Sequence, residues 1–364
     1  MSEVTQTFRP GLERVAAYRA GKPAPVGPDG RSIKLSSNEN PYPPLPAVVA
    51  RLAEVLPHSI SRYPSIAAEE LTGALAARFD VAADNIALGA GSVEVAAQLI
   101  HALTAPGDEV MFAWRSFEAY PILVRVAGAV PVEVPLDAEH RHDLPAMAAA
   151  ITDRTRLVFV CNPNNPTGTV VTAAELEAFM ALVPRDVLVV VDEAYVHFDR
   201  AAESPSGIDF FRRFPNIAVL HTFSKAYGLA GLRVGYAIAP TDVAEALRKV
   251  AIPFAVSRLA QEAAVASLAA EAELDARVED MVAERARLTA ALLAAGVPAV
   301  PSEANFVWLP VGDGAAGVAA ALEERGISAR AFAGEGVRVS IGDPTENDAV
   351  IGAAAAIAAA ATPR

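Results

Sequence analysis

Uninterrupted apolar runs along the chain alternate with segments of helical spacing. Residues 187–191 contain no polar position, which indicates a strand buried on both faces, as in a parallel sheet covered by helices. Helical spacing at 66–78 and 93–103 fills two of the intervals. The pattern predicts an α/β fold with a large domain built on a mostly parallel central sheet covered by helices. The predicted strands are 86–88, 110–112, 157–160, 187–191, 217–220 and 234–238.

The two ends of the chain differ from this central region. Residues 1–46 are rich in Pro and Gly, which predicts an extended arm that lies on another domain or on a partner subunit. After Pro253 the pattern changes to that of a smaller α+β domain, with helices at 259–293 and 317–325 and strands at 306–309 and 337–341. We therefore expect an N-terminal arm joining the small domain (1–46), a large domain (47–253) and a small C-terminal domain (254–364).

Composition narrows the class of protein. Of 364 residues, 53% are hydrophobic and 20% are charged, which excludes intrinsic disorder. A single cysteine excludes a disulfide scaffold. The net charge of −13 argues against a nucleic-acid partner, because binding a phosphate backbone takes clustered Lys and Arg.

The sequence also predicts a compartment. The first six residues have neither a basic region nor an apolar core, so we expect no targeting segment. The longest uncharged apolar stretch, 351–362, is shorter than the roughly 20 residues that span a bilayer. We expect a cytoplasmic protein without a membrane partner.

Polar residues follow four of the predicted strands at the point where each strand ends. Ligands of open parallel sheets bind outside the carboxyl ends of the strands, so four such groups on one edge describe a site. The groups are Gly91-Ser92, the segment 162–168, the segment 192–195 and the segment 222–225.

Two charged residues of these groups suggest chemistry. Asp192 ends an apolar run, where a carboxylate is costly to bury without a positive partner; a protonated ring nitrogen of a cofactor suits it, and a helix N-cap is the alternative. Lys225 is either a surface charge or a partly desolvated amine able to form a Schiff base. Thr222, Ser224 and Arg233 flank it with the hydroxyls and the cation that a phosphate needs.

A glycine-rich turn opens the helix after the first strand. The segment 89–94 is similar to the dinucleotide fingerprint, but Glu94 stands where the third glycine belongs, so we exclude a nicotinamide cofactor. A single phosphate at this helix N-terminus suits the segment, with Gly91 and Ser92 as its ligands. The segment 165–168 is a turn whose Asn165 amide, with Tyr195, suits a phenolic oxygen.

These residues together resemble the fold-type I pyridoxal-phosphate aminotransferases. The resemblance runs from about Leu35 to Asn347, and two further motifs narrow it to the histidinol-phosphate aminotransferase-like branch. The motifs that carry it are Lys225 with Ser224 and Arg233, Asp192 with Tyr195, Asn165-Pro166-Thr167-Gly168, Asn38-Glu39-Asn40-Pro41-Tyr42 and Arg62-Tyr63-Pro64.

The resemblance implies pyridoxal 5'-phosphate as cofactor and a role for each residue. Lys225 is the catalytic residue, which binds the cofactor covalently and moves the proton. Asp192 pairs with the pyridine nitrogen and keeps the ring an electron sink. Asn165 and Tyr195 hold the phenolic oxygen, and Phe117 stacks on the ring. The cofactor phosphate is bound by Gly91, Ser92, Thr222, Ser224 and Arg233.

The resemblance also implies partners. Tyr63 reaches the cofactor phosphate of a neighbouring subunit, which implies a homodimer with shared active sites. Arg338 grips the anionic group of the substrate, and Asn165, Asn40 and Tyr42 complete the substrate site. The substrates are small molecules, an amino acid and a 2-oxo acid, with 2-oxoglutarate and glutamate as the usual second pair.

The amino donor is the open question. A guanidinium binds the carboxylate of an aromatic amino acid as well as the phosphate of histidinol phosphate. Arg338 therefore does not distinguish between these two amino donors. The segment 112–121 resembles the actinobacterial aromatic aminotransferases, because Phe117 stands where biosynthetic histidinol-phosphate enzymes commonly have tyrosine. Trp114 and Tyr120 either line an apolar pocket with Phe117 or belong to the core. We predict an aromatic amino acid aminotransferase, with histidinol phosphate as the alternative substrate.

Other candidates are weaker. We expect Cys161 to be a small buried hydrophobe, and His140 and His142 to lie in a solvated loop without a metal. A pyridoxal-phosphate decarboxylase would use the same cofactor residues. A non-catalytic sensor that keeps the fold is the alternative outside enzymes.

Overall fold

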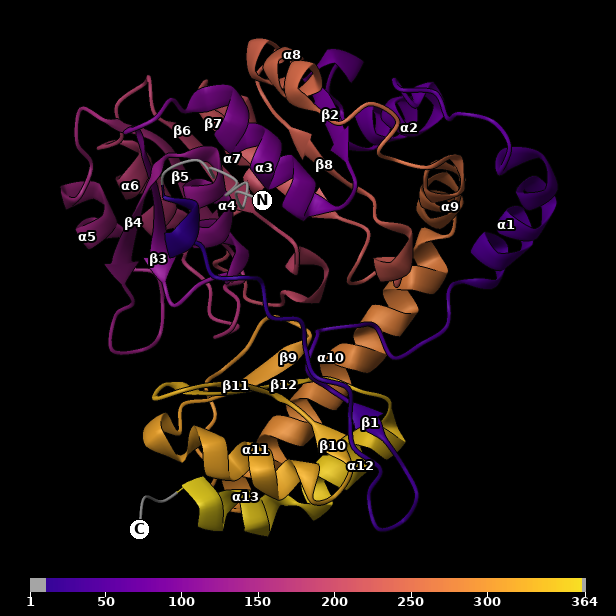
Figure 1. The fold of residues 1–364 in the computed structure, drawn as a ribbon, viewed down its shortest axis with the longest axis vertical. Coiled ribbons are helices and arrows are strands. Elements are labelled where there is room, and N and C mark those ends of the chain that lie inside the picture. The colour runs from indigo at the N-terminus through magenta and orange to yellow at the C-terminus, as the bar shows by residue number, and fades with distance from the viewer. Residues whose placement is uncertain (1–10, 362–364) are drawn as a thin grey trace, which may run out of the picture.

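A seven-stranded sheet forms the centre of the larger, upper part of the molecule (Figure 1). The computed structural model describes residues 11–361. The strand order is β2-β8-β7-β6-β5-β3-β4, and all neighbouring pairs are parallel except those of β8 with β2 and with β7. The strands are β2 (Ile86–Gly89), β3 (Glu109–Trp114), β4 (Val130–Pro135), β5 (Thr155–Cys161), β6 (Leu188–Asp192), β7 (Ile217–Thr222) and β8 (Gly235–Ile238).

Both faces of this sheet are covered, which confirms the predicted fold class. Successive residues of a strand point to opposite faces, and in β6 Val189 and Val191 enter one hydrophobic core while Leu188 and Val190 enter the other. The first core is closed by α1 (Pro46–Ser59), α2 (Glu69–Phe79), α5 (Leu144–Ala149), α6 (Ala173–Met180), α7 (Gly207–Arg213) and α9 (Arg258–Ala269). The second is closed by α3 (Ser92–Leu103), α4 (Ala119–Ala127) and α8 (Thr241–Val250).

The edge strand β4 has no counterpart among the predicted strands. It pairs in parallel with β3 and contains Pro131 and Pro135. Proline cannot donate to a ladder, so a segment with two prolines is unlike a central strand and is tolerated at an edge.

The long predicted helix at 259–293 is two helices. α9 ends at Ala269, Ala270 leaves the helical conformation, and α10 (Glu271–Ala294) follows. Ala260, Ala263 and Ala264 of α9 join the core of the larger part, although the predicted boundary at residue 253 assigned them to the small domain. We therefore propose that the boundary lies within α10.

A smaller α+β part, as predicted for the C-terminal region, lies below the sheet (Figure 1). The antiparallel strands β11 (Arg330–Phe332), β12 (Gly336–Ser340) and β9 (Phe306–Leu309) pack against α11 (Ala315–Glu323), α12 (Pro344–Gly352) and α13 (Ala354–Ala361). Leu288 and Leu292 of α10 enter the same core. The N-terminal arm joins this part, because its strand β1 (Ile33–Lys34) pairs in parallel with β10 (Ile327–Ser328).

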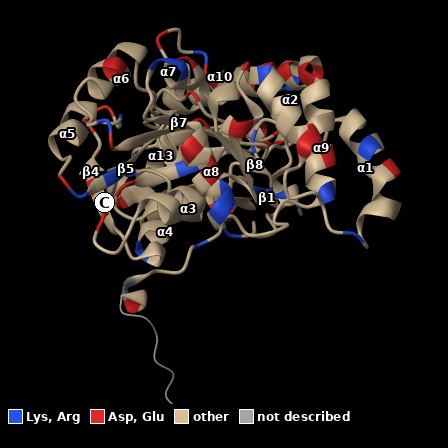
Figure 2. Ribbon diagram, turned by 90° about the horizontal axis from the view of Figure 1, so that it is seen from above, with Lys and Arg blue, Asp and Glu red and all other residues tan. Residues whose placement is uncertain are grey.

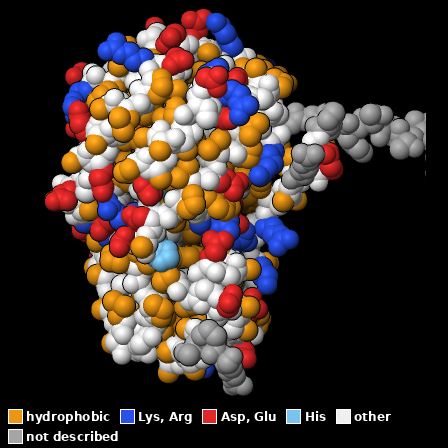
Figure 3. All heavy atoms as spheres, turned by 90° about the vertical axis from the view of Figure 1, so that its left-hand side faces the viewer, with side chains coloured by type: hydrophobic (Ala, Val, Ile, Leu, Met, Phe, Trp, Pro, Cys, Tyr) orange, Lys and Arg blue, Asp and Glu red, His pale blue; other side chains and the backbone are white. Residues whose placement is uncertain are grey.

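Charged side chains lie mainly on the outer helices and loops in the view from above (Figure 2). The strands of the central sheet carry few of them: Glu109, Glu133, Arg156 and Asp192. On the face drawn in Figure 3, acidic and basic side chains alternate, and both signs gather where the two parts meet. Within residues 11–361, no helix combines the length and the hydropathy needed to cross a bilayer.

Candidate active site

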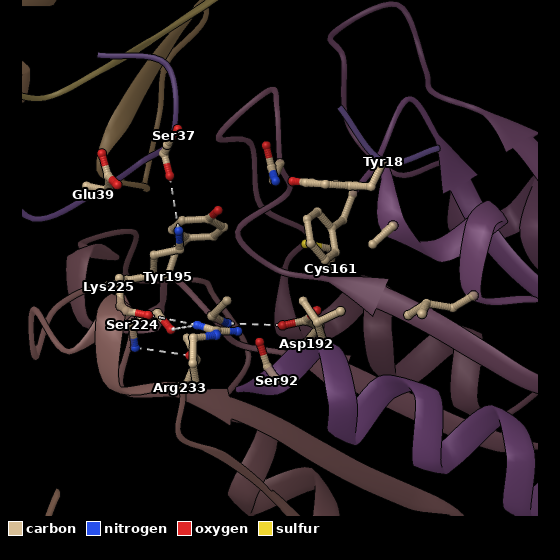
Figure 4. Close-up of a pocket in the computed structure, with 18 of the residues that line it drawn as sticks. Tyr18, Ser37, Glu39, Ser92, Cys161, Asp192, Tyr195, Ser224, Lys225 and Arg233 are labelled. Atoms are coloured by element: carbon tan, nitrogen blue, oxygen red, sulfur yellow. Dashed lines mark hydrogen bonds between the residues drawn. The ribbon is translucent and has the colours of Figure 1, made fainter. Parts of the chain in front are cut away.

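A cavity of about 370 Å³ opens at the carboxyl ends of the central strands (Figure 4). A second cavity of about 80 Å³ adjoins it, because both are lined by Asn165, Tyr195 and Lys225. The sequence-predicted residues on these walls are Ser92, Phe117, Asn165, Asp192, Tyr195, Thr222, Ser224, Lys225, Arg233 and Arg338.

Strand direction explains why distant residues meet here. Cys161, Asp192 and Thr222 are the last residues of β5, β6 and β7, which run parallel and side by side. Their carboxyl ends therefore reach the same edge of the sheet. Lys225 follows three residues after β7, so the turn that ends this strand brings the amine to the cavity.

Asp192 is a buried carboxylate whose hydrogen bonds come from neutral groups. The Tyr120 hydroxyl donates to its Oδ2 at 2.5 Å, and the Ala194 N–H donates to its Oδ1 at 3.2 Å. Burial raises the pKa of Asp192 to about 6, and the two hydrogen bonds oppose that rise because they favour the ionised form. The carboxylate therefore suits a cationic ligand in the cavity.

The amine of Lys225 approaches the cavity from the neighbouring turn (Figure 4). Its Nζ donates to the carbonyl oxygens of Asn38 at 3.1 Å and Ser37 at 3.4 Å. Burial, together with the positive charges of Arg338 and Arg233, lowers the pKa of Lys225 to about 7. A substantial share of the amine is therefore neutral near pH 7, which is the form that attacks a carbonyl.

The N-terminus of α3 and Arg233 form an anion site at one end of the cavity. Gly91 caps the helix at a φ of 85°, and a Cβ at this position would collide with the Arg233 guanidinium. Arg233 Nη1 donates to Ser224 Oγ at 3.3 Å, and Thr222 Oγ1 accepts from the Ser224 N–H at 3.1 Å. Free helix N–H groups, a guanidinium and two hydroxyls are the donors that bind a phosphate.

A second cationic position lies in the smaller cavity. Arg338 is buried; its Nη1 donates to Asn165 Oδ1 at 2.5 Å and its Nη2 to the Ser36 carbonyl at 2.9 Å. Its Nε has no hydrogen-bond partner among residues 11–361. The Tyr195 hydroxyl beside it accepts from Asn38 Nδ2 at 3.0 Å. A buried guanidinium with a donor to spare suits an anionic group of a ligand.

Four predicted residues lie outside the walls of both cavities; one of them, Gly91, lies against Arg233 at the N-terminus of α3. Asn40 Nδ2 donates to the carbonyl oxygens of Lys225 and Ala226, so this side chain fixes the backbone of the lysine turn. Burial and the acidic residues near α10 raise the pKa of Tyr42, which lies away from the cavity walls. The Tyr63 side chain is 82% exposed and stacks on Phe254 at 4.5 Å between ring centroids. The predicted roles of these residues stay predictions.

Several wall residues were not predicted from the sequence. Tyr18, Ser37 and Glu39 come from the N-terminal arm, and Figure 4 shows Tyr18 directed into the cavity. Glu118 and Arg330 line the smaller cavity. The arm was predicted to lie on another part of the protein, but its motif at 38–42 indicated Asn40 and Tyr42 rather than these three side chains.

The aromatic segment after β3 divides between the cavity and the core. Phe117 lines both cavities. Tyr120 is fully buried, stacks on Phe159 at 4.6 Å and holds Asp192. Trp114 carries the Arg115 guanidinium over its ring at 4.2 Å. The packing interpretation therefore holds for Trp114 and Tyr120, and the cavity interpretation for Phe117.

One expectation about histidine is wrong. His142 is buried rather than solvated: its Nε2 is 3.1 Å from Asn164 Oδ1, and burial lowers its pKa to about 4. Asn164 also accepts from the Ser116 hydroxyl, so the histidine supports the loop that carries Asn165. Cys161 is buried, and burial raises the pKa of its thiol.

The residues present fit pyridoxal 5'-phosphate. The cradle at Gly91 and Arg233 suits its phosphate, and Asp192 offers a buried carboxylate to a protonated ring nitrogen. The low pKa of Lys225 suits an amine that reacts with an aldehyde.

Comparison with known proteins agrees with this geometry. The family model for "Aminotransferase class I and II" matches residues 31–353, and the chain belongs to this family. This family is pyridoxal-phosphate-dependent, so the predicted enzyme class and cofactor are confirmed.

Particular relatives are similar over nearly the whole chain. Proteins named aromatic amino acid aminotransferase from Streptomyces coelicolor and Rhodococcus opacus are 57% and 52% identical; the alignments cover 96% of this chain and 96% and 95% of those proteins. The crystal structure of histidinol-phosphate aminotransferase from Sinorhizobium meliloti in complex with pyridoxal-5'-phosphate has a TM-score of 0.87 at 27% identity, with 98% of this chain and 99% of that chain covered.

Proposed function

We propose that the protein transfers the amino group of an aromatic L-amino acid to 2-oxoglutarate, which gives an aryl 2-oxo acid and glutamate. The observation that supports amino-group transfer is that Lys225, Asp192 and Arg338 line two adjoining cavities. The identity of 50–57% to relatives named aromatic amino acid aminotransferase supports the substrate class.

The cofactor, when bound, supplies an electron-withdrawing ring that stabilises negative charge at the substrate Cα. In our proposal the Nζ of Lys225 would take the proton from this Cα and deliver it to the aldehyde carbon of the cofactor, for which its pKa of about 7 is suited. Asp192 keeps a positive charge at the ring nitrogen. Asn165 and Tyr195 orient the ring oxygen, Phe117 covers the ring, and the phosphate is held by Gly91, Ser92, Thr222, Ser224 and Arg233.

The walls of the cavities support an aromatic substrate. Arg338 is buried beside the smaller cavity, and its Nε, which has no partner among residues 11–361, can donate to one carboxylate. Ile122 and Leu123 of α4, together with Phe117, form apolar surface on the larger cavity. An aromatic ring gains from burial on such a surface, whereas a doubly charged phosphate does not.

Histidinol phosphate is the second candidate substrate, because the structural neighbour from Sinorhizobium meliloti carries that name. The deciding experiment is a single-turnover half-reaction of holoenzyme with L-phenylalanine or with L-histidinol phosphate, without an oxo acid. The absorbance change of the bound cofactor gives a rate over affinity for each donor. Faster capture of phenylalanine supports the proposal, and faster capture of histidinol phosphate overturns the substrate assignment.

The role of Lys225 has its own test. The Lys225→Ala variant should lose the absorbance of covalently held cofactor and nearly all turnover. Surviving turnover in a correctly folded variant would contradict the mechanism.

We also propose a homodimer with shared sites, in the cytoplasm. Tyr63 is exposed together with apolar neighbours such as Ile60, Ile66 and Ile252, and exposed apolar patches mark protein interfaces. The single cysteine, Cys161, is unpaired, which suits a reducing compartment. Mixing a Lys225 variant with a Tyr63 variant should restore activity through hybrid dimers with one intact site. No recovery despite proven subunit exchange would exclude the shared site.

A further inference from the structure

An ion pair is built into the wall of the smaller cavity. Arg330 of β11 binds Glu118 in a bidentate manner: Nη2 lies 2.9 and 3.0 Å from the two carboxylate oxygens, and Nε lies 3.2 Å from one of them. The Arg330 side chain is 14% exposed and that of Glu118 is 29% exposed. Arg330 Nη1 also donates to the Ala20 carbonyl of the N-terminal arm. The pair therefore joins three segments at the cavity.

Arg330 and Arg338 form two adjacent positive positions. They are opposite one another in the antiparallel pair of β11 and β12, so their side chains leave the sheet on the same face. Both guanidinium groups lie near the Phe332 ring, at 5.8 and 6.0 Å from its centroid. Arg330 has a protein carboxylate as partner, whereas the hydrogen bonds of Arg338 go to an amide oxygen and a backbone carbonyl.

We infer that Glu118 is a specificity-determining residue: by occupying Arg330 it leaves Arg338 as the cation for the carboxylate of an amino acid, and it selects against donors that carry a doubly charged phosphate. This inference rests on the proposed function, because it explains how that site prefers an aromatic side chain. The class of ligand disfavoured is a phosphate monoester.

The physical reason is competition for one guanidinium. A phosphate in the smaller cavity must either displace the Glu118 carboxylate from Arg330 or lie beside it, and a like charge at that distance is repulsive. The Glu118 side chain makes no cap hydrogen bond to α4, and the guanidinium of Arg330 holds it at the cavity wall. A substrate with one carboxylate and an apolar ring leaves the pair intact.

The chain offers a matched control. Arg115 and Glu335 form a second ion pair between the same two parts of the molecule, and neither residue lines a cavity. Glu335→Gln removes an interdomain charge pair as Glu118→Gln does, but it leaves Arg330 occupied.

The test compares holoenzyme of both variants with the wild type. We would measure kcat/KM for L-phenylalanine and L-histidinol phosphate, and the inhibition constant of inorganic phosphate against phenylalanine. Glu118→Gln should raise the ratio for histidinol phosphate over phenylalanine about tenfold or more, and should lower the inhibition constant of phosphate to a similar extent. Glu335→Gln should change both by less than about twofold.

Two outcomes would overturn the inference. One is an unchanged ratio and an unchanged phosphate inhibition in Glu118→Gln with a wild-type melting curve. The other is an equal shift in Glu335→Gln, which would assign the effect to a loosened contact between the parts. If Glu118→Gln does not fold, the double variant Glu118→Gln/Arg330→Gln serves instead. It removes the repelling carboxylate together with the guanidinium that a phosphate would gain, so phosphate inhibition should stay within about twofold of the wild type; a gain of about tenfold would refute the idea, because Arg330 could then not be its source.

The failure of this inference is distinguishable from failure of the proposed function. A wild type that prefers histidinol phosphate to phenylalanine overturns the substrate assignment. Phosphate inhibition of the two variants still tests Glu118 in that case.

Discussion

Replacing Tyr120 with phenylalanine removes the hydroxyl that donates to Asp192 and leaves the buried ring in place. The bond is 2.5 Å long, and both partners are buried, so water does not replace the lost donor. A hydrogen bond to a charged group contributes about 1.5–3 kcal/mol. One pKa unit corresponds to about 1.4 kcal/mol, so the pKa of Asp192 should rise from about 6 by about one to two units.

This rise has a consequence for the cofactor. The sign follows from the charge: a protonated Asp192 cannot pair with a positive ring nitrogen, so affinity for pyridoxal phosphate falls as the pH drops through the pKa of the carboxyl. In wild-type enzyme this loss is expected near pH 6, and in Tyr120→Phe it should begin near pH 7 to 8. The loss at pH 6 should be about tenfold or more, and it should shrink towards pH 8.5.

The assay is a titration of the apoenzyme with pyridoxal phosphate between pH 5.5 and 8.5, followed by cofactor absorbance and by protein fluorescence. Tyr227→Phe is the control, because it deletes a hydroxyl from another buried ring, packed at a tilt against Phe223, that does not bond to Asp192. Equal dissociation constants for Tyr120→Phe and wild type across this range would refute the reasoning. An equal shift in Tyr227→Phe would assign the effect to general loosening of the fold.

Three further predictions concern the apoprotein and its anion site. Because the pKa of Lys225 falls from 10.5 to about 7 on folding, the unfolded chain binds the extra proton between these values; Lys225→Met should therefore be more stable than wild type near pH 7 in urea denaturation, with a gain that shrinks as the pH rises towards 10.5. Asn40→Ala removes two hydrogen bonds to the lysine turn and should lower the free energy of unfolding by about 1–2 kcal/mol; no change in urea midpoint would contradict this. Gly91→Ala should weaken cofactor binding by displacing Arg233, whereas Gly107→Ala, at a φ of 94° with open space around it, should cost only backbone strain; equal cofactor affinities would count against the cradle.

The chain predicts those parts of the fold that depend on local pattern. Apolar runs at 157–160 and 187–191 become β5 and β6 because burial on both faces removes polar residues from a strand. The edge strand β4 contains prolines, which are not typical of a strand, so the sequence pattern does not indicate it. The break at Ala270 between α9 and α10 has no glycine or proline that would predict it. These features are decided by tertiary packing.

In the candidate site, too, some residues could be predicted from the sequence and some contacts could not. Residues at strand ends, such as Asp192 and Thr222, could be predicted because the direction of a parallel strand determines where its last residue lies. The bond from Tyr120 to Asp192 and the pair of Glu118 with Arg330 join residues 72 and 212 positions apart. No spacing rule connects such positions. The first contact forms only when α4 packs on the central sheet, and the second only when the two parts of the molecule pack together.

The charges left unmatched in the cavity form a pattern that one ligand explains. Asp192 lacks a bonded cation at one wall, and Arg338 has a donor to spare in the adjoining cavity. Burying either charge alone is costly, and each therefore favours a ligand of opposite charge at its own position. A ring that is positive at its nitrogen, together with a substrate that is negative at its carboxylate, satisfies both. The amine of Lys225 lines both cavities, where its low pKa keeps it free to move a proton. The same burial that destabilises the empty site thus prepares these groups for the reaction.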